Sequence, residues 1–359
     1  MMRAAHPCAL LLLWQFQSDP PAFGQDAAST ATGISRSFNP AISANGLFLA
    51  AYDSEDGAGL KPGHGFGSET GMRVQEVEMQ ISAFVDPYLK ADLIFALPGG
   101  EEIELEEGFV TTQGLPLPLT VKVGKFFADL GRHNLLHAHQ FPFLDAPLVH
   151  QRLLGDEGLN EAGIGVSLLL PTPWFTEVSG QVFDGDNELF ASEDGEDLLY
   201  VGHLRNFVDM GESATLELGG SFAAGNNRFD KLTSVVGGDL TLKWRSLRRS
   251  RGRGLIWQSE YLYSRQNLAG DTKREGGLYS LVQFQFARRW WIQGRYDLFG
   301  LPKEDGARVH RGSALLAFVP SEFSALRLQY NHLEEDGKGV NQLFAQLNFT
   351  IGSHPAHRY

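Results

Sequence analysis

The residues best suited to chemistry lie in one segment, "GRHNLLHAHQFPFLDAPLVHQRLLGDEGLNEAG", residues 131–163. It holds four of the eleven histidines of the chain, His133, His137, His139 and His150. Imidazole is a favoured zinc ligand, but a zinc site also needs fixed geometry and a third or fourth ligand. A His-x-His pair in a loop does not guarantee these. We therefore predict no bound metal or cofactor, and keep His133, His137 and His139 as the residues that would bind zinc if a site exists.

Other catalytic or metal-binding motifs are missing from the sequence. There is no His-Glu-x-x-His, Gly-x-Ser-x-Gly or phosphate-binding loop. The stretch "FDGDNE" places Asp184 and Asp186 like the first and third ligands of a calcium loop, but the sixth position is Leu189 where that loop needs glycine. The sequence predicts a protein that is not an enzyme.

Composition and charge exclude several classes of protein. Residues 1–24 have the pattern of a secretory signal peptide, with Arg3, an apolar run over residues 8–16 and the small-x-small site Ala22-Phe23-Gly24. Cys8, the single cysteine, lies inside this segment, so the exported chain would have no disulfide. A net charge of −13 argues against a nucleic-acid partner. No later run approaches the roughly 18 to 20 apolar residues of a membrane-spanning helix.

The remaining chain alternates apolar and polar residues with a period of two, which is typical of strands with one apolar face. "VEMQISAFV", "LKADLIFAL" and "NQLFAQLNFTI" show the pattern most clearly. The same template predicts sixteen strands, at residues 40–52, 74–86, 88–97, 101–112, 118–127, 161–170, 174–184, 198–208, 213–224, 233–245, 254–266, 277–287, 290–299, 308–319, 322–333 and 341–351.

The connections between these strands alternate between short turns and mostly longer polar loops. Short turns on one side, longer loops on the other and an even strand number are typical of an outer-membrane barrel. Closure also satisfies every backbone polar group in lipid. The fold class is therefore predicted as all-β, a transmembrane antiparallel β-barrel of about sixteen strands. Trp174, Trp244, Trp257, Trp290 and Trp291 lie at strand ends beside short turns, as an interfacial aromatic girdle requires.

Two segments carry a resemblance to a known family. "VKVGKFFADLGRHN", residues 121–134, has a Gly-Lys-Phe strand followed by a Gly turn, and the chain has a final amphipathic strand and a terminal aromatic, Tyr359. The sequence resembles the sixteen-stranded porins of Gram-negative outer membranes, most nearly the phosphate-selective (O/P-type) group. The tail "GSHPAHRY" departs from that pattern, in which the aromatic closes the last strand.

The resemblance implies a location, partners and a domain organisation. It implies the outer membrane of a Gram-negative bacterium, contact with lipid and lipopolysaccharide, and a homotrimer as a candidate assembly. Residues 1–24 would be the signal peptide, 25–38 a short periplasmic segment, and 39–359 the barrel. The third external loop, near 128–160, would fold inward and narrow the pore.

In this interpretation the histidine segment becomes the constriction. Its candidate residues are Arg132, His133, His137, His139, Asp145, His150 and Arg152. The charges predicted to line the pore are Glu76, Glu78, Asp92, Glu104, Glu106, Lys122, Asp239, Glu260 and Arg295, with Glu177, Glu217, Asp297, Lys90, Lys243, Arg245 and Arg327 on the same parity. Because acidic rings favour cations, we expect a weak cation preference.

The sequence therefore favours a passive diffusion channel for small hydrophilic solutes or ions, without a cofactor. Two alternatives stay open. One is a zinc-uptake channel that uses the histidine-rich loop, and the other is an outer-membrane barrel hydrolase.

Overall fold

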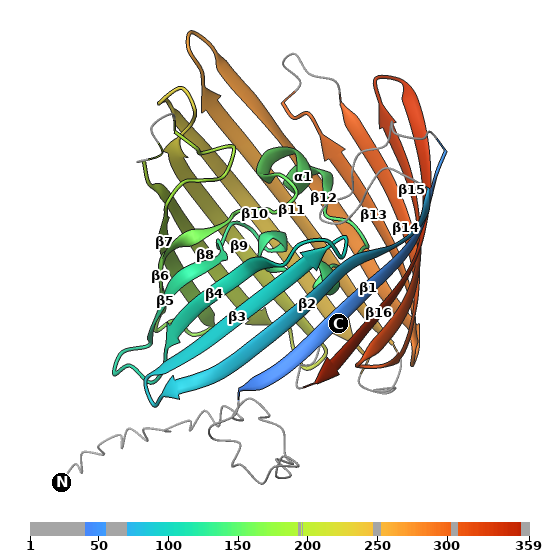
Figure 1. Ribbon diagram of the computed structural model, residues 1–359, viewed down its shortest axis with the longest axis horizontal. Helices are drawn as coiled ribbons and strands as arrows, with labels where there is room; N and C mark the ends of the chain where they lie inside the picture. The colour runs from blue at the N-terminus through green and yellow to red at the C-terminus, as the bar shows by residue number, and fades with distance from the viewer. Residues whose placement is uncertain are drawn as a thin grey trace, which may run out of the picture. The chain divides into compact units, whose positions relative to one another are not determined.

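The chain forms a closed antiparallel barrel of sixteen strands in the computed structural model (Figure 1). The structure describes residues 40–54, 70–192, 195, 197–246, 253–302 and 308–352. The predicted signal peptide at 1–24, the segment 25–38 and the last seven residues of the chain lie outside the described residues. All sixteen predicted strands are confirmed within the described part of the chain.

The strands are β1 (Ala41–Asp53), β2 (Gly71–Asp86), β3 (Leu89–Pro98), β4 (Glu104–Thr112), β5 (Leu119–Phe127), β6 (Asn160–Leu169), β7 (Phe175–Phe183), β8 (Leu199–Asp209), β9 (Ala214–Asn226), β10 (Leu232–Arg245), β11 (Gly254–Asn267), β12 (Thr272–Ala287), β13 (Trp290–Phe299), β14 (Val309–Ser321), β15 (Ser324–Glu335) and β16 (Lys338–Gly352). Each strand pairs with its neighbours in sequence, and β1 pairs with β16 from Ser43↔Gly352 to Asp53↔Gln342 to close the barrel.

Two connections predicted to be long are short in the structure. Only Asp336 and Gly337 join β15 to β16, and both have positive φ, 53° and 74°. An Asp-Gly pair with positive φ at both positions is the preferred two-residue hairpin turn, because its twist matches that of the strands. Likewise, β12 begins at Thr272 and not at 277, since its pairing with β11 continues to Asn267↔Thr272. The residues predicted as loop extend the strands instead.

The two faces of the barrel differ as the alternation predicts. In β15, Leu326, Leu328 and Tyr330 are exposed on the outside, while Arg327 and Gln329 are buried inside. An outward apolar face and a polar interior are the pattern of strands that cross a membrane around a lumen.

The tryptophans follow the predicted girdle with one exception. Trp174, Trp244, Trp257 and Trp290 are exposed on the outer face near the short-turn end. Trp291 is partly buried and packs against the interior core, so its assignment to the girdle was wrong. Because side chains alternate along a strand, two consecutive tryptophans cannot both face lipid.

Residues 128–159, which we call the inner loop, lie inside the barrel (Figure 1). This loop contains the 3₁₀ turns η2 (His133–Leu135) and η3 (Ala138–Gln140) and the helix α1 (Leu148–Leu154), which lies against β11, β12 and β13. Its apolar side chains are buried in a cluster with lumen-facing ones; from the loop these are Ala128, Leu130, Phe143, Leu144, Leu148, Val149, Leu153, Leu154 and Leu159. The inner loop thus packs against the barrel wall through a shared hydrophobic core. Among the described residues, no helix has the length and apolar composition needed to cross a membrane.

Candidate pore constriction

The inner loop begins and ends at the same side of the barrel, between β5 and β6. Asn134 ties its two ends together. The Asn134 Nδ2 donates to the carbonyl oxygens of Ala128 and Leu159 at 2.9 and 3.0 Å, and its Oδ1 accepts the Leu159 N–H at 2.8 Å. The loop therefore enters the lumen as a closed unit and reaches the walls through its side chains.

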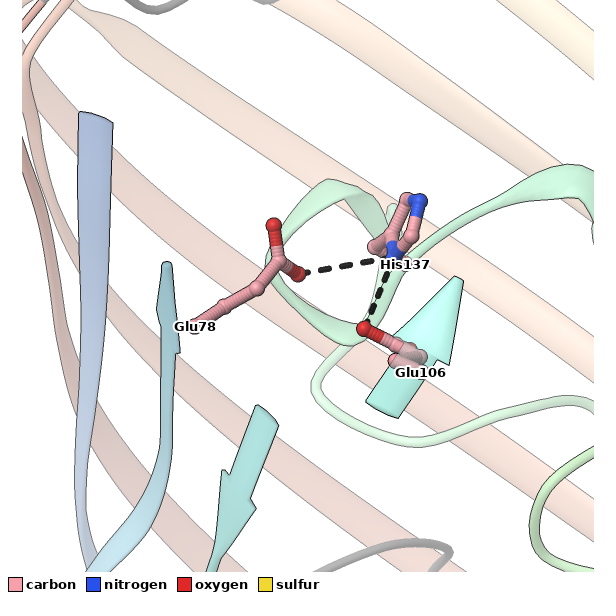
Figure 2. A group of neighbouring side chains, drawn as sticks. All are labelled: Glu78, Glu106 and His137. Carbon is pink, nitrogen blue, oxygen red and sulfur yellow. Dashed lines mark ion pairs between the residues drawn. The ribbon is translucent and has the colours of Figure 1, made fainter. Parts of the chain in front are cut away.

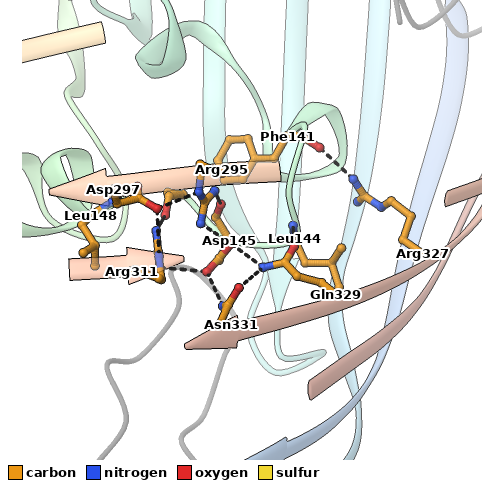
Figure 3. Close-up of polar contacts among 11 residues, drawn as sticks. Phe141, Leu144, Asp145, Leu148, Arg295, Asp297, Arg311, Arg327, Gln329 and Asn331 are labelled. Atoms are coloured by element: carbon orange, nitrogen blue, oxygen red, sulfur yellow. Dashed lines mark hydrogen bonds and ion pairs between the residues drawn. The ribbon is translucent and has the colours of Figure 1, made fainter. Parts of the chain in front are cut away.

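Asp145 fixes the far side of the loop (Figure 3). Its carboxylate contacts Nη2 of Arg295 at 2.7 Å and Nη1 of Arg311 at 2.8 Å, from β13 and β14. Gln329 and Asn331 of β15 donate to the same carboxylate at 2.8 and 3.0 Å. The Asp145 side chain is fully buried. Four donors from three strands thus converge on one loop residue.

Asp297 of β13 completes this network from the wall. It contacts Nε of Arg295 at 2.8 Å and Nε of Arg311 at 3.1 Å, so two carboxylates balance two guanidinium groups. Asp297 also accepts the backbone N–H of Leu148 at 3.0 Å, at the start of α1. A buried ion network of this kind is costly to break, because removing one partner leaves an uncompensated buried charge.

Arg327 and Gln329 hold the loop backbone beside this network. Arg327 Nη1 donates to the carbonyl oxygen of Phe141 at 2.7 Å, and Gln329 Oε1 accepts the Leu144 N–H at 2.7 Å (Figure 3). The strands β13–β15 therefore provide ion-pair partners for Asp145 and hydrogen-bond partners for the backbone of the inner loop.

Glu260 of β11 is a second anchor. Its carboxylate accepts the backbone N–H groups of Arg132 and His133 at 3.3 and 3.2 Å. It also contacts His150 Nε2 and the Tyr279 hydroxyl, each at 3.0 Å. Glu260, predicted as a lumen charge, faces the interior and is buried there against the inner loop.

His133 and His150 form a pair near this anchor, with ring centroids 4.9 Å apart. Burial lowers the pKa of His133 well below its ordinary value, and the nearby His150, Arg295 and Arg311 lower it further. His133 is therefore a neutral packing residue at neutral pH. This placement contradicts a zinc site made of His133, His137 and His139.

His137 lies against the opposite wall, beside Glu78 of β2 and Glu106 of β4 (Figure 2), and His139 also contacts Glu78. His137 Nδ1 is 3.0 Å from Glu106 Oε2 and 3.5 Å from Glu78 Oε2, while its Nε2 is 3.0 Å from Glu107 Oε2. His139 Nδ1 is 2.9 Å from Glu78. Burial by itself lowers the pKa of His137, but Glu78 and Glu106 raise it well above the ordinary value. The surroundings of His137 favour a positive charge.

The two arginines of the loop contact other parts of the lumen. Arg132 Nη1 is 2.8 Å from Glu217 of β9, which also contacts Arg205 of β8 at 2.6 Å. Arg152 makes a partly exposed pair with Glu335, at 2.8 Å. The seven predicted constriction residues therefore all lie on the inner loop, but they divide among separate contacts with different walls.

The remaining predicted lumen charges are placed as follows. Asp92 is buried and pairs with Lys90 at 2.9 Å, and Asp239 is buried opposite Glu260 in the β10–β11 register. Glu104 is exposed at the start of β4, before the strand reaches the cluster around His137.

Sequence parity missed Glu107 because of a β-bulge. The β3–β4 register runs from Ile94↔Glu107 to Phe95↔Leu105, so Glu106 is the extra residue. A bulge shifts the alternation by one, and both Glu106 and Glu107 reach the interior. Glu107 is 3.5 Å from Lys122, whose ammonium also lies 3.6 Å from the centroid of the Phe109 ring.

Arg311, Gln329 and Asn331 were also absent from the predicted site. All three have the inward parity of their strands, so the alternation of β14 and β15 would have identified them. The alternation could not show that all three contact Asp145, because Asp145 is far away in sequence.

Acidification is expected to release the inner loop from β13–β15. Asp145 faces Arg295, Arg311, Gln329 and Asn331; burial alone raises its pKa, but the two arginines lower it from 3.8 to about 2. A carboxyl with a lowered pKa stabilises the folded loop fully above the ordinary value and loses that contribution as the pH falls through about 2. This lowering of the Asp145 pKa corresponds to about 2 kcal/mol of free energy that stabilises the anchored loop.

Single-channel conductance recorded from about pH 5 down to about pH 2 would measure this release as a reversible rise at the acidic end. A channel with Asp145→Asn should lack the transition. An identical titration in both proteins would contradict the assignment to Asp145.

Sequence comparison shows the family to which the chain belongs. An uncharacterized protein of Aquifex aeolicus (strain VF5) is 34% identical over 353 residues, in an alignment that covers 84% of this chain and 74% of the relative. The chain belongs to the family of that Aquifex aeolicus protein. No family model matches the sequence.

Solved structures with a similar fold are outer-membrane porins and channels. The anion-selective porin from Comamonas acidovorans superposes with a TM-score of 0.61 at 11% identity, over 87% of this chain and 100% of that chain. The outer-membrane channel DcaP of Acinetobacter baumannii gives 0.59 at 10% identity, over 87% and 97%. OprB of Pseudomonas putida gives 0.55 at 9% identity, over 87% and 94%. The chain therefore has the fold of the outer-membrane porins.

Proposed function

We propose that the protein is a passive diffusion channel in the outer membrane of a Gram-negative bacterium, narrowed by the inner loop. The observation that carries this proposal is the anchoring of the loop inside a porin-type barrel. Asp145 binds it to β13–β15, Glu260 to β11, and His137 with His139 to β2 and β4. A loop held from several sides restricts the size of a passing solute without any moving part.

We further propose a weak preference for cations. At the wall of β13 and β14, Asp145 of the inner loop and Asp297 of β13 neutralise Arg295 and Arg311. On β2 and β4, Glu76, Glu78, Glu106 and Glu107 lie close together, and Lys122 pairs with Glu107. Among the described residues, these four carboxyl groups lie beside Lys122 and the rings of His137 and His139, so this acidic wall is less compensated by permanent positive charge than the wall of β13 and β14. Carboxylates beside a pore attract cations.

We favour a channel over a barrel hydrolase. A Ser–His contact exists in the lumen, where His203 Nδ1 is 2.8 Å from Ser221 Oγ. However, Ser221 is buried beneath the loop, and its hydroxyl accepts the Gly131 N–H at 2.8 Å. A serine that holds a loop in place has no room for a lipid substrate.

Two finer proposals concern the relatives and the assembly. Residues 121–134 form the end of β5 and the entry of the inner loop, which supports a relationship to the phosphate-selective porins. A homotrimer is supported by the similar fold of the outer-membrane protein OmpT of Vibrio cholerae in its trimer form, with a TM-score of 0.59 at 7% identity over 87% of this chain. It is also supported by an outward apolar hollow of about 740 Å³ over β1, β2 and β13–β16.

Planar-bilayer recording tests the channel. Protein extracted in detergent should give discrete conductance steps, and asymmetric potassium chloride should give a reversal potential of the sign expected for cation preference. Unboiled gels of the same sample should show a heat-modifiable band, with a larger species if the barrel is a trimer. A folded, heat-modifiable barrel without conductance steps would contradict the proposal.

A further inference from the structure

We propose that Glu78, Glu106 and His137 form a binding site for a divalent transition-metal cation such as zinc, which links the inner loop to the wall of β2 and β4. The site does not depend on whether the barrel conducts ions. It uses one of the three histidines in a different ligand set from the one that the sequence suggests.

The geometry brings three donor atoms together from three parts of the chain (Figure 2). One carboxylate oxygen each of Glu78 and Glu106 and one ring nitrogen of His137 all lie within 4.8 Å of one another. Glu78 comes from β2, Glu106 is the bulge residue of β4, and His137 precedes η3 in the loop. Only tertiary folding makes this group.

Glu107 determines which nitrogen of His137 is available. Its Oε2 lies 3.0 Å from His137 Nε2, and a carboxylate there accepts the Nε2 proton. The Nδ1 atom lies 3.0 Å from Glu106 Oε2 and 3.5 Å from Glu78 Oε2, so it is the nitrogen that faces the two carboxylates. A divalent cation bound there would take the place of the proton on Nδ1. A carboxylate that holds the far nitrogen of a histidine is a common feature of protein metal sites.

His139 orients Glu78 in a similar way. Its Nδ1 is 2.9 Å from the Glu78 Oε2 that faces His137. A ligand carboxylate that is itself hydrogen-bonded keeps its position and its basicity. Two side chains, Glu107 and His139, therefore support the three ligands.

Glu76 is an independent indication that a cation belongs here. It lies two residues before Glu78 on β2, is 3% exposed, and interacts electrostatically with Glu78, Glu106 and His137. Its Oε1 is buried and has no hydrogen-bond partner in the described structure. Buried carboxylates this close together repel one another, and a divalent cation removes that repulsion.

The donor set indicates the kind of cation. Calcium and magnesium prefer sites made of oxygen atoms, whereas an imidazole nitrogen with carboxylates suits zinc and neighbouring transition metals. Three protein ligands leave a coordination position for water or a passing anion. Bound metal would also join β2, β4 and the loop, and so hold the histidine end of the loop in place.

Zinc titration of the detergent-solubilised full chain, after treatment with a chelator, tests the site. Calorimetry should show one zinc per chain, with no comparable heat from magnesium or calcium. His137→Ala and Glu106→Gln should each lower the affinity by about a hundredfold or more, and Glu107→Gln by roughly 10- to 100-fold with the stoichiometry kept. His133→Ala is the matched control on the same loop and should bind as wild type. Cobalt in place of zinc should give a visible absorption spectrum that is lost in His137→Ala.

The following results would overturn the proposal. They are the absence of zinc binding to wild type, equal binding by His137→Ala and Glu106→Gln, or loss of binding in His133→Ala but not in His137→Ala. Zinc would fail to bind to wild type if the Nδ1 atom of His137 kept its proton between the two carboxylates. Heat-modifiable mobility on gels verifies that each variant is folded, and Glu78→Gln replaces any variant that is not.

Discussion

Replacing Asp145 by asparagine is expected to release the inner loop from β13–β15, raise single-channel conductance and shift the selectivity toward anions. The variant keeps the size of the side chain but leaves the buried Arg295 and Arg311 with Asp297 as their remaining carboxylate. Breaking a buried ion pair by removal of one partner costs about 3–5 kcal/mol. That cost falls on the loop, because the sixteen strands of the barrel are paired without it.

Bilayer recording in asymmetric salt measures both effects, and limited proteolysis of the solubilised protein measures the exposure of the loop. Asp156→Asn is the matched control, because it removes the same charge from an exposed position of the same loop. If Asp145→Asn and Asp156→Asn conduct alike, Asp145 does not anchor the loop.

Removing charge from the acidic wall is expected to abolish the preference for cations. In the double variant Glu78→Gln/Glu106→Gln, two of the clustered carboxylates beside the loop become neutral while their size is retained. A unit charge several ångströms from a permeating ion contributes about 1 kcal/mol after screening, which is roughly a fivefold change in the permeability ratio. The reversal potential should therefore move toward zero or change sign.

The recording is made with chelator in the bath, so that loss of the metal ligands Glu78 and Glu106 has no separate effect. Glu101→Gln/Glu102→Gln is the control, since it removes two charges from exposed positions of the β3–β4 connection. The proposal is contradicted if the reversal potential stays at the wild-type value in the variant of the acidic wall but shifts in the control. The charges that determine selectivity would then lie at the β3–β4 connection.

The sequence alone determined the barrel, because the alternation of apolar and polar residues is local. Each strand needs one face for lipid and one for the interior, and this requirement is visible in short stretches such as "VEMQISAFV". The inner loop was also found, since residues 128–159 interrupt the alternation between β5 and β6. Local information gave the lumen position of residues such as Glu78 and Arg295.

Tertiary structure decided which of these residues meet. Asp145 binds side chains on β13, β14 and β15, and His137 binds carboxylates on β2 and β4. The bulge at Glu106 depends on the pairing of β4 with β3, so parity alone could not place Glu107. Four histidines in one segment suggested one site, but the loop turns within the lumen and sends His133 and His137 to different walls. The physical reason is that the alternation within a strand depends on residues that are neighbours along the chain. The contacts of the inner loop depend instead on strands that are distant in sequence and surround the loop only after the barrel closes.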